Sequence, residues 1–207
     1  MEFVGADPSV IRSIRQRVLL NDWLRAARKR EPLPLLSDFS PDGIGDEIAD
    51  MMGYNVVGSG SGARFVITQQ GARLSATYGN DRNDPDKWIG RCLDEGLGPD
   101  RYARVLPSYL ACLARKRPSY SISTVQDADG KDVSYERLLL PFGKADAVEQ
   151  IVGSFKAISV AGGFKVNNLI GLKSSRVPVT VINAVIDLNF VPAESGARAG
   201  DEVVELG

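Results

Sequence analysis

The sequence contains no histidine, and this absence excludes several classes of function. Histidine is the commonest metal ligand and the only side chain whose ordinary pKa lies near neutral pH. Ser-His-Asp and Cys-His nucleophile pairs, His-ligated haem and His-containing zinc sites are therefore ruled out. Carboxylates and lysine remain available for catalysis. A protein that recognises a ligand or partner is nevertheless a better first hypothesis than an enzyme.

Cysteine and long apolar runs are also scarce. The two cysteines, Cys92 and Cys112, are too few and too far apart for a zinc knuckle, so no metal site is predicted. Both lie in partly apolar helical patterns, which indicates buried, reduced thiols. The first residues lack the basic and apolar regions of a signal peptide, and no apolar run approaches the roughly 20 residues of a membrane-spanning helix. We therefore expect a cytoplasmic protein without a membrane span.

The charges balance overall, with a net charge of -1, so no global field selects nucleic acid or membrane. Basic residues concentrate between residues 12 and 30, where Asp22 is the one acid: Arg12, Arg15, Arg17, Arg25, Arg28, Lys29 and Arg30. A solvated helix face is the simplest interpretation, and an anionic partner or membrane surface is the alternative. No second recognition helix follows, so no nucleic-acid partner is predicted.

Hydrophobic periodicity predicts the order of the elements. Apolar residues at spacings of three and four predict an amphipathic helix over 11–29, which Pro32 and Pro34 end. A short helix over 37–52 precedes two strand-like segments at 54–57 and 64–68. Helical patterns follow at 71–78, 87–95 and 99–115, and Pro107 should bend or split the last of these. Strands are predicted at 120–126, 133–142 and 151–159.

This order predicts an α+β fold in which an antiparallel five-stranded sheet has helices on one face and an amphipathic N-terminal helix precedes it. Residues 1–52 form an N-terminal helical extension, 53–160 the main domain, and 161–190 a C-terminal extension whose apolar pattern does not distinguish strand from helix. Residues 191–207 are small, acidic and glycine-rich, which predicts a disordered tail.

Two strands, short helices, a longer helix and three strands is the order of a PAS domain, a sensor fold with a pocket between helices and sheet. Over residues 11–160 the chain resembles a PAS-like family of uncharacterised single-domain bacterial proteins of about this length, mainly alphaproteobacterial. The matching segments are NDWLR at 21–25, PLLSDFSP at 34–41, GARL at 71–74 with Tyr78-Gly79, and YERLLLP at 135–141. The chain departs from this family at 68–70, where an arginine is usual, and in its more polar loop at 80–86.

The resemblance implies a sensory or adaptor protein with a mostly apolar pocket suited to a small apolar ligand. The candidate pocket residues are Phe65, Ile67, Trp88, Tyr109, Tyr120 and Glu136. The same aromatic residues can instead simply fill the core. Strand alternation places Glu136 on the face of Leu138 and Leu140, opposite Tyr135, Arg137 and Leu139.

No cofactor is predicted. Gly90-Arg91-Cys92 superficially resembles the cysteine segment of flavin-binding PAS domains, but Leu93-Asp94-Glu95 follows it where those domains have arginine, which argues against a flavin. The glycines at 58–62 do not form a dinucleotide fingerprint, because a strand-like segment follows them and not a helix.

The chain contains no kinase, cyclase or DNA-binding pattern, so any signal is expected to leave through an unknown protein partner. The first helix suggests a homodimer, with Ile14, Val18, Trp23 and Leu24 as candidate contacts. Two alternatives stay open. One is a small α+β-cone enzyme that uses Glu136 as a base beside Tyr109 or Tyr120. The other is a ligand-free interaction module with a filled core.

Overall fold

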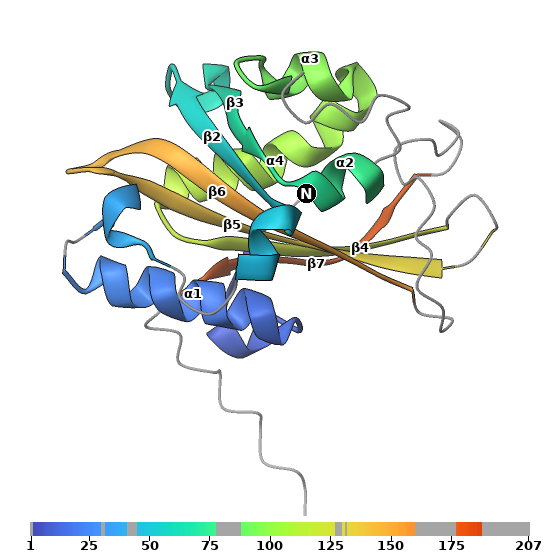
Figure 1. Cartoon of the computed structure of the whole chain (residues 1–207), viewed down its shortest axis with the longest axis horizontal. Coiled ribbons are helices and arrows are strands. Elements are labelled where there is room, and N and C mark those ends of the chain that lie inside the picture. The colour runs from blue at the N-terminus through green and yellow to red at the C-terminus, as the bar shows by residue number, and fades with distance from the viewer. Residues whose placement is uncertain are drawn as a thin grey trace, which may run out of the picture.

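A seven-stranded sheet forms the centre of the molecule, with helices on both of its faces (Figure 1). The computed structural model describes residues 2–29, 32–40, 45–77, 88–126, 130, 132–159 and 177–187. The strands lie in the order β1-β7-β4-β5-β6-β2-β3. Neighbouring strands run antiparallel, except that β1 pairs in parallel with β7 at one edge.

The strands account for most of the regular structure. Their bounds are β1 Val4–Ala6, β2 Met51–Val57, β3 Arg64–Gln70, β4 Ser119–Gln126, β5 Asp132–Lys144, β6 Ala147–Ser159 and β7 Val179–Ile186. The strands β2 to β6 form a contiguous antiparallel block in the order β3-β2-β6-β5-β4. The predicted order of two strands, a helical segment and three strands is therefore confirmed.

Helices precede and interrupt this block. The α-helices are α1 Ile14–Ala27, α2 Ala72–Thr77, α3 Leu93–Leu97 and α4 Pro99–Arg115, and the 3₁₀ helices are η1 Pro8–Val10, η2 Leu36–Asp38, η3 Gly45–Asp50 and η4 Gly60–Gly62. The hydroxyl of Ser13 caps α1 by accepting a hydrogen bond from the backbone N–H of Gln16. Pro107 lies inside α4, which continues past it as one helix, so of the two predicted effects the split does not occur.

The sheet separates two apolar cores. On one face, Leu20 and Trp23 of α1 pack with Tyr120, Leu138 and Leu140. On the other face, Tyr109 and Cys112 of α4 pack with Phe65, Leu139 and Ile151. Figure 1 shows α1 below the sheet and α2, α3 and α4 above it. Because side chains alternate along a strand, successive residues of β5 serve opposite cores, as predicted.

Two expectations for the architecture are wrong. The sheet has seven strands and not five, and helices cover both of its faces. The three-residue β1 is too short to leave a sequence pattern, and β7 lies in the segment whose pattern was mixed. The pairing of β4 with β7 contains a register shift. An extra residue at such a bulge interrupts the alternation of side chains, which explains why the apolar pattern of the β7 segment has no single period.

The N-terminal region also differs in detail. The helix expected over 37–52 is divided into the 3₁₀ helices η2 and η3, and Met51 and Met52 already belong to β2. Within α1, Ile14 is one of the apolar residues whose spacing predicted the helix, but it lies in the first helical turn and is 76% exposed. Leu19 and Ala26 are buried instead. The predicted loop at 80–86 and tail at 191–207 lie outside the described residues.

Candidate functional site

Three tyrosines and one arginine meet in the core between α4 and the sheet. Tyr54 comes from β2, Tyr109 from α4, and Tyr135 and Arg137 from β5. Together we call them the tyrosine–arginine cluster. Tyr135 and Arg137 share a face of β5 because they are two residues apart. The cluster therefore places polar groups in the layer between α4 and the sheet.

The tyrosines form the interior part of the cluster. The hydroxyl of Tyr109 donates a hydrogen bond to that of Tyr54 at 2.9 Å, and the two rings meet edge to face at 5.3 Å. The ring of Phe65 lies 4.9 Å from that of Tyr109. The predicted pocket residues Phe65, Ile67 and Tyr109 are thus brought together, with Trp88 packed at their margin. The rings of Tyr54 and Phe65 both contact the ring of Tyr109, and these side chains fill this part of the core.

Arg137 forms the outer part of the cluster and is only partly buried. Its guanidinium carbon lies 5.7 Å from the centre of the Tyr135 ring and 6.0 Å from that of Phe155. Its Nη1 donates to the hydroxyl of Ser108 at 3.4 Å, whereas its Nε is buried without a hydrogen-bond partner. Within the described part of the chain, no carboxylate forms an ion pair with Arg137.

A row of polar residues continues from Arg137 across the sheet. Ser121 of β4 lies directly opposite Arg137, and Asn183 of β7 lies opposite Ser121. Directly opposed residues point to the same face. The side-chain oxygen of Asn183 is also buried without a partner. Arg137 thus has aromatic rings on one side and polar groups on the other.

The electrostatics of the cluster leave its tyrosines protonated. Burial raises the pKa of Tyr54 and of Tyr109, and the positive charge of Arg137 acts in the opposite direction without reversing the shift. Burial also raises the pKa of Tyr135 to about 12, although Arg137 acts in the opposite direction. At neutral pH the cluster therefore carries one positive charge, on Arg137, beside neutral hydroxyls. Such a set of groups is suited to hydrogen-bond an acceptor or an anion.

Tyr120 and Glu136 lie on the other face of the sheet, beneath α1. The hydroxyl of Tyr120 donates to Oε2 of Glu136 at 2.9 Å and accepts from the backbone N–H of Arg12 at 3.1 Å. Burial raises the pKa of Tyr120, which keeps this donor protonated. The six predicted pocket residues therefore fall into two groups. Tyr120 and Glu136 lie on the α1 face, and the other four lie on the α4 face.

The division of these residues between the two faces of the sheet limits which of them could act together in an enzyme. Glu136 and Tyr109 lie on opposite faces of the sheet and cannot act together. Glu136 and Tyr120 are joined, but Glu136 is 2% exposed and the pair connects β4 and β5 to the residue just before α1. The arrangement supports a structural link between α1 and the sheet.

The predicted dimer residues of α1 differ in their exposure. Trp23 is fully buried, and its Nε1 donates to the carbonyl oxygen of Pro141 at 2.7 Å. Val18 and Leu24 are partly buried. Ile14 alone among the four presents most of its surface to solvent. A partner on this helix would therefore contact Ile14 and could not reach Trp23.

A network of ion pairs joins α1, η3 and β6, and sequence reasoning missed it. Lys156 lies 2.6 Å from the carboxylates of both Glu47 and Asp50, and Arg15 lies 3.0 Å from Glu47. Arg73 adds a contact to Asp50 at 3.0 Å. Burial raises the pKa of Asp50, but the hydrogen bonds and charges of Arg73 and Lys156 outweigh it, and the net shift is downward. No sequence signal could reveal this network, because its members come from separate elements.

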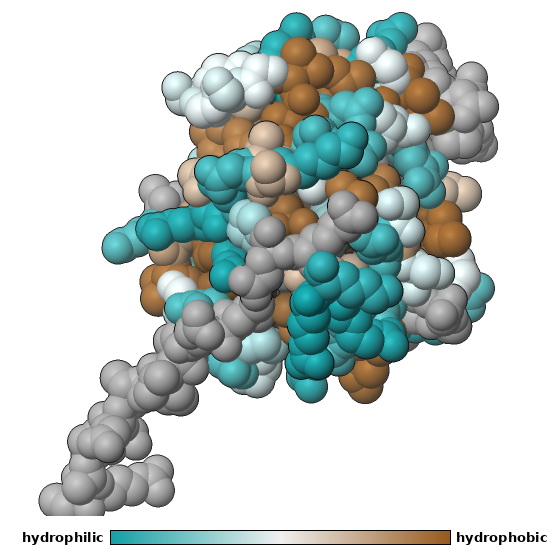
Figure 2. Space-filling model, turned by 90° about the vertical axis from the view of Figure 1, so that its left-hand side faces the viewer, coloured by the Kyte–Doolittle hydropathy of each residue, from teal (hydrophilic) through white to brown (hydrophobic). Residues whose placement is uncertain are grey.

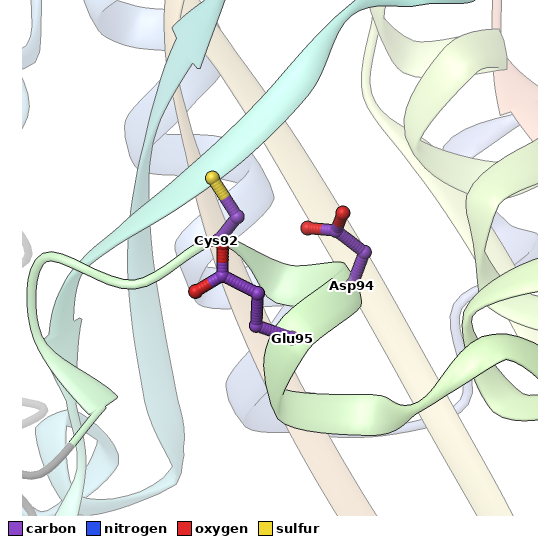
Figure 3. A group of neighbouring side chains, drawn as sticks. All are labelled: Cys92, Asp94 and Glu95. Atoms are coloured by element: carbon purple, nitrogen blue, oxygen red, sulfur yellow. The ribbon is translucent and has the colours of Figure 1, made fainter.

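Cys92, Asp94 and Glu95 gather at the start of α3, as Figure 3 shows. Arg64 already lies between the two carboxylates, with Nη2 2.9 Å from Asp94 and 3.1 Å from Glu95. Burial raises the pKa of the Cys92 thiol, and a protonated thiol is a poor metal ligand. We therefore assign this group as an ion-paired surface cluster. Cys92 and the fully buried Cys112 are both free thiols, although Cys92 is less buried than expected.

Among the described residues, a partly open cavity of about 200 Å³ lies beside β2, lined by residues that include Leu36, Phe39, Ile48, Thr68, Gln69 and Gln150. None of its lining residues is charged. On the side drawn in Figure 2, hydrophobic residues lie in several groups between hydrophilic ones. Among the described helices, none combines the length and the apolar character needed to cross a membrane.

Comparisons with known proteins give little further information. No protein-family model matches the sequence, and no curated protein matches it. Among solved structures, an RNA-binding light-oxygen-voltage receptor aligns with a TM-score of 0.36 and 18% sequence identity. The alignment covers 56% of this chain and 31% of the receptor chain. A likeness at this level carries no argument about fold or function.

Proposed function

We propose that this chain is a PAS-like sensory or adaptor protein that binds a small ligand between α4 and the sheet. The block β3-β2-β6-β5-β4, with α2, α3 and α4 inserted between β3 and β4, supports a PAS-like arrangement. The observation that carries the proposal is Arg137. Its Nε is a buried donor without a partner beside two aromatic rings, and such a group is costly unless something binds it.

Output through the α1 face follows from the alternation along β5. Arg137 points to the core of α4, and its neighbour Glu136 points to α1, where Tyr120 connects it to the backbone of Arg12. A ligand that shifts β5 at Arg137 also shifts the contacts under α1. This mechanism requires the ligand to bind one arrangement of β5 more tightly than the other. The receiver of the signal is a protein partner at α1.

Native mass spectrometry of the purified protein tests the ligand. We expect a species heavier than the sequence mass, whose additional mass is lost on denaturation. Hydrogen exchange then tests the output: removal of the ligand should speed exchange in α1 as well as in β5. A protein that carries no bound mass, and whose α1 exchange is the same with and without every compound tested, would instead be the interaction module with a filled core.

A further inference from the structure

Within the described part of the chain, the partly buried Arg137 differs from the buried charges in having no counter-charge. Glu47 has Arg15 and Lys156, and Asp22 has Arg25. Glu136 receives the hydroxyl of Tyr120. Among the described residues, Arg137 has the weak bond to Ser108, a side-chain hydrogen bond with Tyr135 and the faces of two aromatic rings. Cation–π contacts compensate part of the lost hydration, but they leave the N–H of its Nε without an acceptor.

We propose that the tyrosine–arginine cluster binds the carboxylate of a small organic acid with an apolar body. This inference rests on the proposed function and names the ligand class of the same site. It replaces the purely apolar ligand that the sequence suggested. The guanidinium of Arg137 holds the carboxylate, and the rings of Tyr135 and Phe155 contact the apolar body.

A carboxylate fits these groups better than a phosphate does. The planar guanidinium matches a carboxylate through two parallel N–H···O bonds. The cluster offers a single positive charge, because burial keeps its tyrosines protonated. One carboxylate is neutralised by that charge, whereas a phosphate dianion would remain partly unpaired in a desolvated site.

The site can be reached without opening the core. Arg137 and Tyr135 are both partly exposed, whereas Tyr54 and Tyr109 lie fully buried behind them. The ligand therefore approaches from the side of Arg137. Ser121 and Asn183 line the polar side of this approach, so the carboxylate lies between them and the aromatic rings.

Binding of defined probes to the full chain tests the inference. Isothermal titration and thermal unfolding compare benzoate, phenylacetate and butyrate with benzamide, the neutral analogue of benzoate, and with inorganic phosphate. We expect at least one acid to bind about 10-fold or more tightly than benzamide and phosphate. Near saturation it should raise the unfolding midpoint by about 5 °C. The Nε–H resonance of one arginine should shift in the NMR spectrum.

Variants separate the role of Arg137 from a general effect of charge. Arg137→Gln should weaken binding of the acid about 10-fold or more, whereas Arg115→Gln, at the exposed end of α4, should change it less than about 2-fold. Without ligand, Arg137→Met should unfold at a higher temperature than the natural chain, because it removes an uncompensated charge. If Arg137→Met is folded and does not bind the acid, the loss of binding does not result from a loss of folding.

Three results would overturn the inference. The first is equal affinity for benzoate and benzamide, the second is retained acid binding in Arg137→Gln, and the third is failure of all three acids to bind. If native mass spectrometry meanwhile reveals a bound neutral molecule, the sensory proposal stands and the carboxylate assignment fails. A protein that carries no bound molecule and binds no acid would contradict both.

Discussion

At the scale of single residues, the buried polar groups serve two purposes. On the α1 face Tyr120 donates to Glu136, whereas Oε1 of Gln16 and Oδ2 of Asp22 are buried acceptors without a partner. On the α4 face Arg137 keeps an unpartnered donor. A paired group contributes to stability and specificity of packing, whereas an unpartnered one weakens the unliganded fold and favours a ligand.

Tyr120→Phe should lower the free energy of unfolding by about 1–3 kcal/mol, because it leaves the buried Glu136 and the N–H of Arg12 without their partner. Urea denaturation measures this change. The double variant Tyr120→Phe/Glu136→Leu should regain part of the loss, since both polar partners are then replaced by apolar groups. A double variant less stable than the single one would contradict this account.

Asp50 makes stability depend on pH in the acid range. Although burial acts in the opposite direction, Arg73 and Lys156 hold its pKa in the folded chain below the ordinary value of 3.8. The stabilisation is therefore complete above that value and is lost as the pH falls through the lower pKa of the folded state. Urea unfolding between about pH 6 and pH 3 should show a smaller decline in Asp50→Asn than in the natural chain. Parallel declines in the two proteins would refute the role of Asp50.

At the scale of elements, α1 is held in place by packing and by long-range hydrogen bonds from Arg15, Gln16 and Trp23. A helix of 14 residues is marginal by itself in water. Its docking depends on Leu19, Leu20 and Trp23, which fit against β4, β5 and β6. The Nε1 of Trp23 reaches the carbonyl of Pro141, whose strand carries Glu136 and Arg137. The helix and the candidate site are thus joined through β5.

Trp23→Phe should cost about 1–3 kcal/mol, since it removes this hydrogen bond and leaves a buried carbonyl unpaired. Trp23→Ala should cost about 3–5 kcal/mol through the cavity that it creates. Chemical denaturation measures both losses of unfolding free energy. In both variants, hydrogen exchange should accelerate more in α1 than in α4. Trp88→Phe serves as the matched control, because Trp88 is only partly buried and packs in the other core.

Long, strongly periodic elements could be predicted from the sequence. The helix α4 begins at the predicted Pro99, and the alternation of β5 assigned Glu136 and Arg137 to opposite faces. The short or irregular elements could not be predicted. The strand β1 has three residues and acquires its pairing only from β7, and the 3₁₀ helix η3 is held by ion pairs to distant residues.

At the scale of the whole molecule, the homodimer stays a prediction. The exposed position of Ile14 on α1 makes it the test residue, because it can be changed without disturbing the core. Ile14→Asp should convert a dimer to monomers in sedimentation experiments while leaving the unfolding midpoint within a few degrees. Val57→Asp, at an exposed position on β2, is the control. A dimer that survives Ile14→Asp would place the interface elsewhere.

The sequence by itself determined the α+β class, the long helices and strands, the face of each β5 residue and the functions that the absence of histidine excludes. These follow from composition and from periodicity along a single element. Only the tertiary structure decided that Tyr109 meets Tyr54, that Tyr120 meets Glu136, and that Arg137 lacks a counter-charge. Such contacts join residues far apart in the chain. They depend on strand order, register and bulges, which local patterns do not encode.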